Sequence, residues 1–72
     1  MPLVEERRMI RADGVREGEY VYYPPSDWWV LVRRAVHDGQ GIRLECLAPD
    51  GREFMTRANA WTLLRVAREE MD

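Results

Sequence analysis

The sequence predicts a single, mainly β domain, and three observations lead to this fold class. The chain has 72 residues, the size of one small domain. Asp-Gly pairs, which favour tight hairpin turns, occur at residues 13–14, 38–39 and 50–51. Between the last two pairs, residues 42–46 alternate apolar and charged side chains with the period of a half-buried strand. We therefore expect about five antiparallel strands.

The remaining strands are placed by β-branched and aromatic residues between turn signals. Pro24 and Pro25 end the strand predicted at residues 19–23, because proline cannot donate a hydrogen bond to a ladder. Residues 1–14 form an N-terminal segment, an edge strand or a partly ordered stretch, in which residues 9–12 suit an edge strand. The predicted strands lie within residues 19–23, 28–36, 42–46 and 53–57.

The C-terminal segment fits two structures. Asn59 suits a helix cap, and the apolar residues that follow fall on one helical stripe. Residues 62–66 fit a fifth strand equally well. We expect a turn near Asn59 and then a short strand. Residues 67–72 are expected to form a tail, either a short C-terminal helix or frayed.

The alternation within the strands also predicts the core. Cys46 belongs to the apolar set of its strand and is expected to act as a small buried hydrophobe, not as a reactive thiol. The predicted core residues are Val30, Val32, Ile42, Leu44, Cys46, Phe54, Leu64 and Val66.

Composition argues against several classes of function. The formal net charge is −2, and all eleven basic residues are arginines scattered among thirteen acids, a bias that fits a bacterium with a GC-rich genome. Without a basic tract, non-specific binding to nucleic acid has little support. One histidine and one cysteine cannot furnish a zinc site, and no cofactor or catalytic motif is present. We expect a cytoplasmic protein with no signal peptide, no membrane span and no enzymatic activity.

One motif resembles a family of folds. The stretch Val-Arg-Glu-Gly-Glu-Tyr-Val at residues 15–21 is similar to the opening of SH3-like small barrels, the class that contains Tudor and KOW domains, in which a glycine and an acid precede the first strand. The resemblance covers residues 15–66. It implies a small barrel that binds peptides, modified side chains or nucleic acid. The basic loops of nucleic-acid-binding KOW domains are missing.

Aromatic residues are the best candidates for binding, because five of the seven lie between residues 20 and 29. Neighbouring side chains of a strand point to opposite faces. Trp28 shares its face with Val30 and Val32, so Trp29 is expected to point outward, where tryptophan often contributes to binding. Of Arg33 and Arg34, one is expected outward and the other towards the core or its edge. The candidate partner-binding residues are Tyr20, Tyr22, Trp28, Trp29, Arg33 and Arg34.

The favoured function is that of an adaptor that binds a protein partner through this aromatic and arginine surface. A sharper version is an aromatic cage, in which several of these rings, with Asp27 as the acid, would surround a methylated cation. Two alternatives stay open. A nucleic-acid-binding barrel would gather its arginines on one face, and a structural subunit would use the aromatic surface as a homodimer interface.

Overall fold

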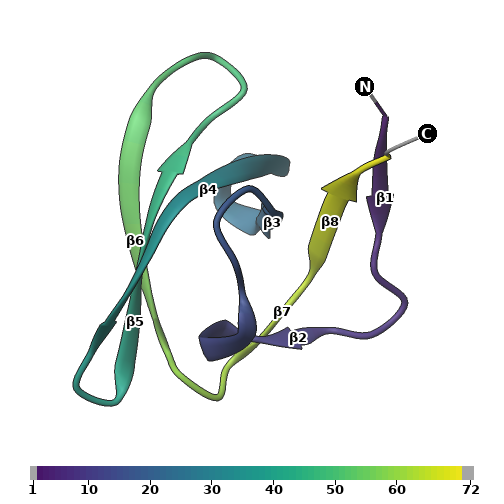
Figure 1. Cartoon of the computed structure of the whole chain (residues 1–72). Coiled ribbons are helices and arrows are strands. Elements are labelled where there is room, and N and C mark those ends of the chain that lie inside the picture. The colour runs from purple at the N-terminus through teal and green to yellow at the C-terminus, as the bar shows by residue number, and fades with distance from the viewer. Residues whose placement is uncertain (1, 71–72) are drawn as a thin grey trace.

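The chain folds into antiparallel strands, as the computed structural model shows for residues 2–70 (Figure 1). Strands make up 58% of the described residues, which contain no α-helix. Two single 3-10 turns interrupt them, η1 (Ala12–Gly14) and η2 (Pro24–Ser26). The strands are β1 (Leu3–Glu5), β2 (Ile10–Arg11), β3 (Tyr20–Tyr23), β4 (Trp28–Asp38), β5 (Gly41–Leu47), β6 (Glu53–Asn59), β7 (Leu63–Leu64) and β8 (Val66–Glu69).

The main sheet has six strands in the order β1-β8-β3-β4-β5-β6, and β2 pairs with β7 in a second, two-stranded sheet. Strands β3 to β6 form an antiparallel meander, and β8 returns to pair with β3. Figure 1 shows β1 and β8 side by side, away from the β5–β6 hairpin. The end strands β1 and β6 do not pair with each other, so the sheet is not closed into a barrel.

The predicted C-terminal helix is wrong. A turn follows β6 and leads into the short strand β7, as expected, but Val66–Glu69 then forms β8. This strand pairs with β1 on one side and with β3 on the other. Val66 and Ala67 are fully buried, so tertiary pairing and burial override the local helix propensity. Residues 71 and 72 of the predicted tail lie outside the described residues.

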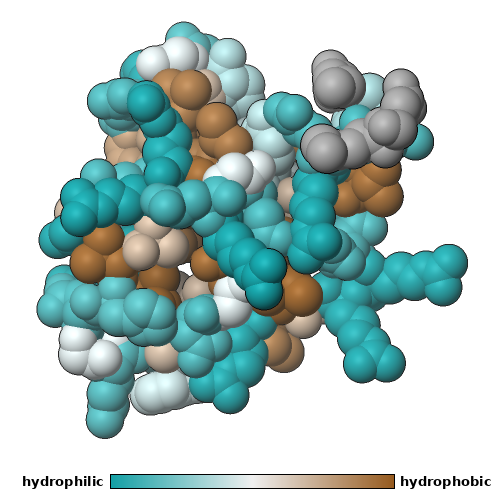
Figure 2. Space-filling model, in the orientation of Figure 1, coloured by the Kyte–Doolittle hydropathy of each residue, from teal (hydrophilic) through white to brown (hydrophobic). Residues whose placement is uncertain are grey.

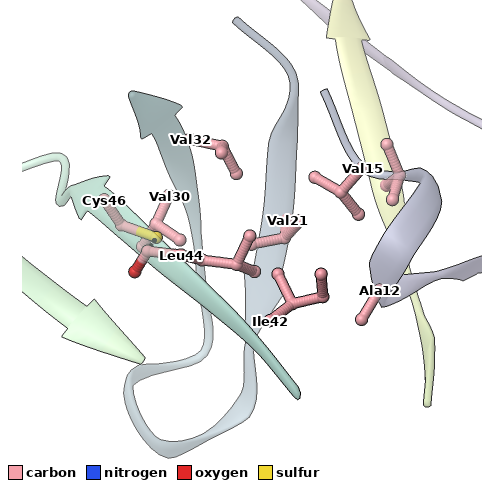
Figure 3. Close-up of a cluster of buried hydrophobic side chains, with 9 residues drawn as sticks. Ala12, Val15, Val21, Val30, Val32, Ile42, Leu44 and Cys46 are labelled. Atoms are coloured by element: carbon pink, nitrogen blue, oxygen red, sulfur yellow. Dashed lines mark hydrogen bonds between the residues drawn. The ribbon is translucent and has the colours of Figure 1, made fainter. Parts of the chain in front are cut away.

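The core lies on the inner face of the main sheet (Figure 3). Six of the eight predicted core residues are buried, and the other two, Phe54 and Leu64, are partly buried and pack against them. The sequence prediction missed Val21 on β3, and Ala12 and Val15 from the N-terminal segment. Figure 3 shows Ala12 and Val15 facing the side chains of β4 and β5. The N-terminal segment thus covers a core that the meander alone would leave open.

A bulge in β4 corrects the prediction for the two arginines. Val32 lies opposite Cys46, but Arg34 lies opposite Glu45, so Arg33 is an extra residue without a partner in β5. The extra residue resets the alternation. Arg34 keeps an outward position and Ala35 takes the inner position opposite Leu44. Both arginines are therefore exposed, and neither points into the core.

The turn before β3 shows why the stretch at residues 15–21 contains a glycine followed by an acid. Gly18 has a φ of 91°, which disfavours residues with a side chain, and its N–H donates to the Val32 carbonyl at 2.8 Å, beside the bulge. Glu19 is only 7% exposed. Its carboxylate accepts the Arg16 N–H at 2.7 Å and Arg68 Nε at 2.8 Å. The glycine and the acid thus hold the start of β3 against β4 and β8.

Candidate functional site

The two tryptophans lie on opposite faces of the sheet. Trp28 is opposite Tyr23 and packs against the core, as expected from its alternation with Val30. The Tyr23 ring contacts Phe54, with 5.1 Å between centroids, so aromatic side chains close this end of the core. The indole Nε1 of Trp28 is buried without a hydrogen-bond partner among the described residues. Trp28 is therefore a packing residue.

The outer face of the same strands carries a second apolar surface. Directly opposite residues of neighbouring strands share a face, and the ladder places Tyr20, Leu31 and Leu47 in one row and Tyr22 and Trp29 in the next. All five side chains are partly exposed. We call these five residues the outer aromatic face.

A shallow groove of about 620 Å³ runs across this surface. Residues of β3, β4 and β5 line it, and Leu3 of β1 and the β5–β6 turn also contribute. The lining residues are Leu3, Tyr20, Asp27, Trp28, Trp29, Leu31, Leu47, Ala48 and Pro49. Apolar residues reach the surface between charged ones near the end of the molecule where β5 turns into β6 (Figure 2). An open groove of aromatic and aliphatic side chains can accept the apolar side chains of another molecule.

Arg65 lies over the aromatic pair at one side of the outer aromatic face. The Tyr22 and Trp29 rings meet edge to face with 5.6 Å between centroids. The Arg65 guanidinium lies 4.5 Å from the Tyr22 centroid and 5.3 Å from that of Trp29. Two hydrogen bonds of 2.9 and 2.7 Å join it to the Glu5 carboxylate. This ion pair lowers the pKa of Glu5 and raises the pKa of Arg65.

The tyrosine hydroxyls at this surface are also engaged. Tyr22 donates to Asp27, and Tyr20 donates to Glu69 at 2.7 Å. Each hydrogen bond to a carboxylate raises the pKa of the tyrosine. The two hydroxyls link β3 to the η2 turn and to β8, respectively.

This geometry argues against an aromatic cage for an external cation. Trp28 starts from the opposite face of β4 to Trp29 and packs against the core, although it also borders the groove. The cation over Tyr22 and Trp29 is Arg65 of the chain itself. What remains open to a partner is the apolar row formed by Tyr20, Leu31 and Leu47.

The two candidate arginines do not join the groove. Arg33 pairs with Glu53 at 2.6 Å, and it lines a separate hollow formed by β4, β5 and β6, which Met55 also lines. Arg34 faces Glu45, with 3.9 Å between the charged atoms. The sequence prediction thus combined two surfaces that the bulge separates.

Sequence reasoning missed Leu31, Leu47 and Arg65. The two leucines carry a detectable signal, because Leu31 is two residues from Trp29 and Leu47 is out of phase with the buried set of β5. Arg65 carries no comparable signal, since it is 36 positions from Trp29 in the sequence. Trp61 in the β6–β7 turn is 54% exposed and is a further exposed aromatic residue that sequence reasoning missed.

No group of histidine, cysteine and acidic residues within residues 2–70 is arranged to hold a metal ion. In the same range, no helix is long and apolar enough to span a membrane. Comparison with protein-family models, curated proteins and solved structures finds no match to this chain.

Proposed function

We propose that this chain is a small SH3-like binding module that recognises a protein partner through the outer aromatic face. The proposed barrel relation is supported by the meander β3 to β6 and by the return of β8 to β3. The proposed function is supported mainly by one observation. The central strands of the sheet carry apolar side chains on both faces, and the outer set stays partly exposed.

The apolar row sets the kind of partner. Tyr20, Leu31 and Leu47 offer ring and branched aliphatic surface, and residues of this kind form the centre of protein interfaces. Around them the charges are already paired, as in the Glu5–Arg65 ion pair. A peptide segment with apolar side chains suits this surface better than a highly charged one.

The arrangement of the arginines supports a protein partner over a nucleic acid. Binding to a phosphate backbone depends on cationic groups that are free to replace counterions. Eight of the eleven arginines are in ion pairs with acids, spread over both sheets: Arg11, Arg33, Arg34, Arg43, Arg52, Arg57, Arg65 and Arg68.

A peptide-display selection tests this proposal. Peptides selected on the unmodified protein should be rich in apolar residues and should lose binding at least tenfold to the Leu31→Arg variant, because a charge then occupies the groove. Leu63→Arg is the matched control, since Leu63 is an exposed leucine of β7, in the other sheet. Equal loss of binding in both variants, or in neither, would contradict the proposal.

A further inference from the structure

Strand β6 is the far edge of the main sheet, and its outer side has free backbone groups. The β5–β6 ladder is bounded by two bonds, Ala48 N–H to the Arg52 carbonyl at 2.8 Å and Ala60 N–H to the Gln40 carbonyl at 2.9 Å. Arg52 and Ala60 therefore face β5, and so does every second residue between them. The backbone groups of the intervening residues point away from β5. The Asn59 carbonyl accepts the Thr62 N–H at 3.0 Å, but no described residue pairs with the outward backbone groups of Glu53, Met55 and Arg57.

The side chains of these same three residues are exposed. Met55 is 56% exposed, and the side chains of Glu53 and Arg57 are 71% and 59% exposed. An edge strand is commonly protected by charges, because like charges meet when two copies approach. On β6 the two charges are opposite in sign and lie equally far from Met55. An antiparallel copy would bring opposite charges together.

We propose that β6 binds β6 of a second copy of this chain, antiparallel and centred on Met55. In this register Glu53 of each protomer lies opposite Arg57 of the other, and the two Met55 residues face each other. The three free outward residues of each strand, Glu53, Met55 and Arg57, then form three hydrogen-bonded pairs, with two backbone bonds in each pair. The two six-stranded sheets would join into one continuous sheet around a twofold axis.

Charge selects this register over its neighbours. A shift that places Met55 opposite Arg57 leaves both glutamates without a cation across the edge, and the reverse shift leaves both arginines without an acid. In the centred register, the pairs within each protomer, Arg33–Glu53 at 2.6 Å and Arg57–Asp38 at 2.7 Å, extend across the interface. At each end of the interface, Arg33 and Glu53 of one protomer and Arg57 and Asp38 of the other then form a row of four charges of alternating sign. This inference depends on the edge strand and not on the outer aromatic face.

Charge reversal at the edge tests the proposal. The unmodified chain, of 8.5 kDa, should sediment as a monomer when dilute. At a protein concentration about a hundredfold higher, its apparent mass should approach twice that value. Glu53→Arg and Arg57→Glu should each stay monomeric at the higher concentration, because each variant brings like charges together. An equimolar mixture of the two variants should dimerise again, since one edge is then positive and the other negative.

Controls separate this interface from others. Arg11→Glu makes the same charge change at a side chain that is also 59% exposed, on β2, and should dimerise normally. Leu31→Arg should also dimerise, which distinguishes the edge from the outer aromatic face. Far-ultraviolet circular dichroism should show the same strand content in all variants. A chain that is monomeric at both concentrations, a dimer that survives both reversals, or a mixture that stays monomeric would overturn the proposal.

Discussion

The two halves of β4, before and after the bulge at Arg33, have different environments. In the first half, Trp28 to Val32, the residues up to Leu31 pair with β3, and Leu31 and Val32 pair with β5. Its inner and outer faces are both apolar. The second half, Arg34 to Asp38, pairs with β5 alone and presents mostly charged side chains on its outer face. One extra residue thus divides a long strand into an apolar half and a charged half.

The difference shows how a chain this short can have both a core and a second surface. A small domain buries only a limited fraction of its surface. Apolar side chains clustered on its outer face lower its solubility, so such a cluster indicates an interaction site. Most of these side chains gather in the part of the sheet where β3, β4 and β5 lie together, whereas Met55 on β6 lies apart from this group. Beyond the bulge, the outer positions carry paired charges such as Arg57 and Asp38. This clustering of the outer aromatic face favours recognition over general packing.

The largest expected effect distinguishes the two faces of the apolar half. Trp28→Ala should lower the free energy of unfolding by about 3 kcal/mol, because it leaves a cavity against the core. Trp29→Ala should cost about 1 kcal/mol, from the lost contacts with Tyr22 and Arg65. Urea denaturation followed by circular dichroism measures both. Equal losses would show that the two rings are equally important for packing, contrary to the assignment of the faces.

The next effect concerns the contact beside the bulge. Gly18→Ala should cost about 1–2 kcal/mol, because a side chain is strained at a φ of 91° and Gly18 holds the Val32 carbonyl. Gly14→Ala is the control, since Gly14 has no positive φ and a Cβ there would meet Ile10 Cγ2 at 3.4 Å, at the near limit of ordinary van der Waals contact. Thermal unfolding of both variants gives the comparison. Similar melting temperatures for the two would contradict this account of the turn.

The smallest effect is a pH dependence at the margin of the outer aromatic face. The Glu5–Arg65 ion pair lowers the pKa of Glu5 below its ordinary value of 4.5. Its stabilising contribution is therefore present above that value and is lost as the pH falls through the lowered pKa of the folded state. Carbon-detected NMR titration should give a lowered Glu5 pKa in the unmodified chain and an ordinary one in Arg65→Gln. An ordinary Glu5 pKa in the unmodified chain would contradict the pairing.

The features that the sequence predicts well are local. The strands from β3 to β6 follow from β-branched residues between turn signals, and strict alternation places Ile42, Leu44 and Cys46 in the core. The same alternation places Trp28 inward and Trp29 outward, because no irregularity intervenes between them and Val32.

The features it misses depend on contacts between distant residues. The bulge at Arg33 lies beside the Gly18–Val32 hydrogen bond, which joins residues fourteen positions apart. The C-terminal strand forms because two partner strands are available to it, one of them at the opposite end of the chain. Arg65 directly precedes this strand and lies beside Tyr22 and Trp29 because the strand pairs with β3. Such contacts leave no periodic signal in the sequence.

The most direct test of the proposed function is a residue-by-residue map of partner binding. A display-selected peptide is titrated into ¹⁵N-labelled protein, and the backbone amide shifts are followed by NMR. Binding to the outer aromatic face predicts that the largest changes fall at Tyr20, Leu31 and Leu47, with residues 34–38 nearly unchanged. The largest changes within residues 34–38, or at β7 and the Trp61 turn, would contradict the proposal that this face is the recognition surface.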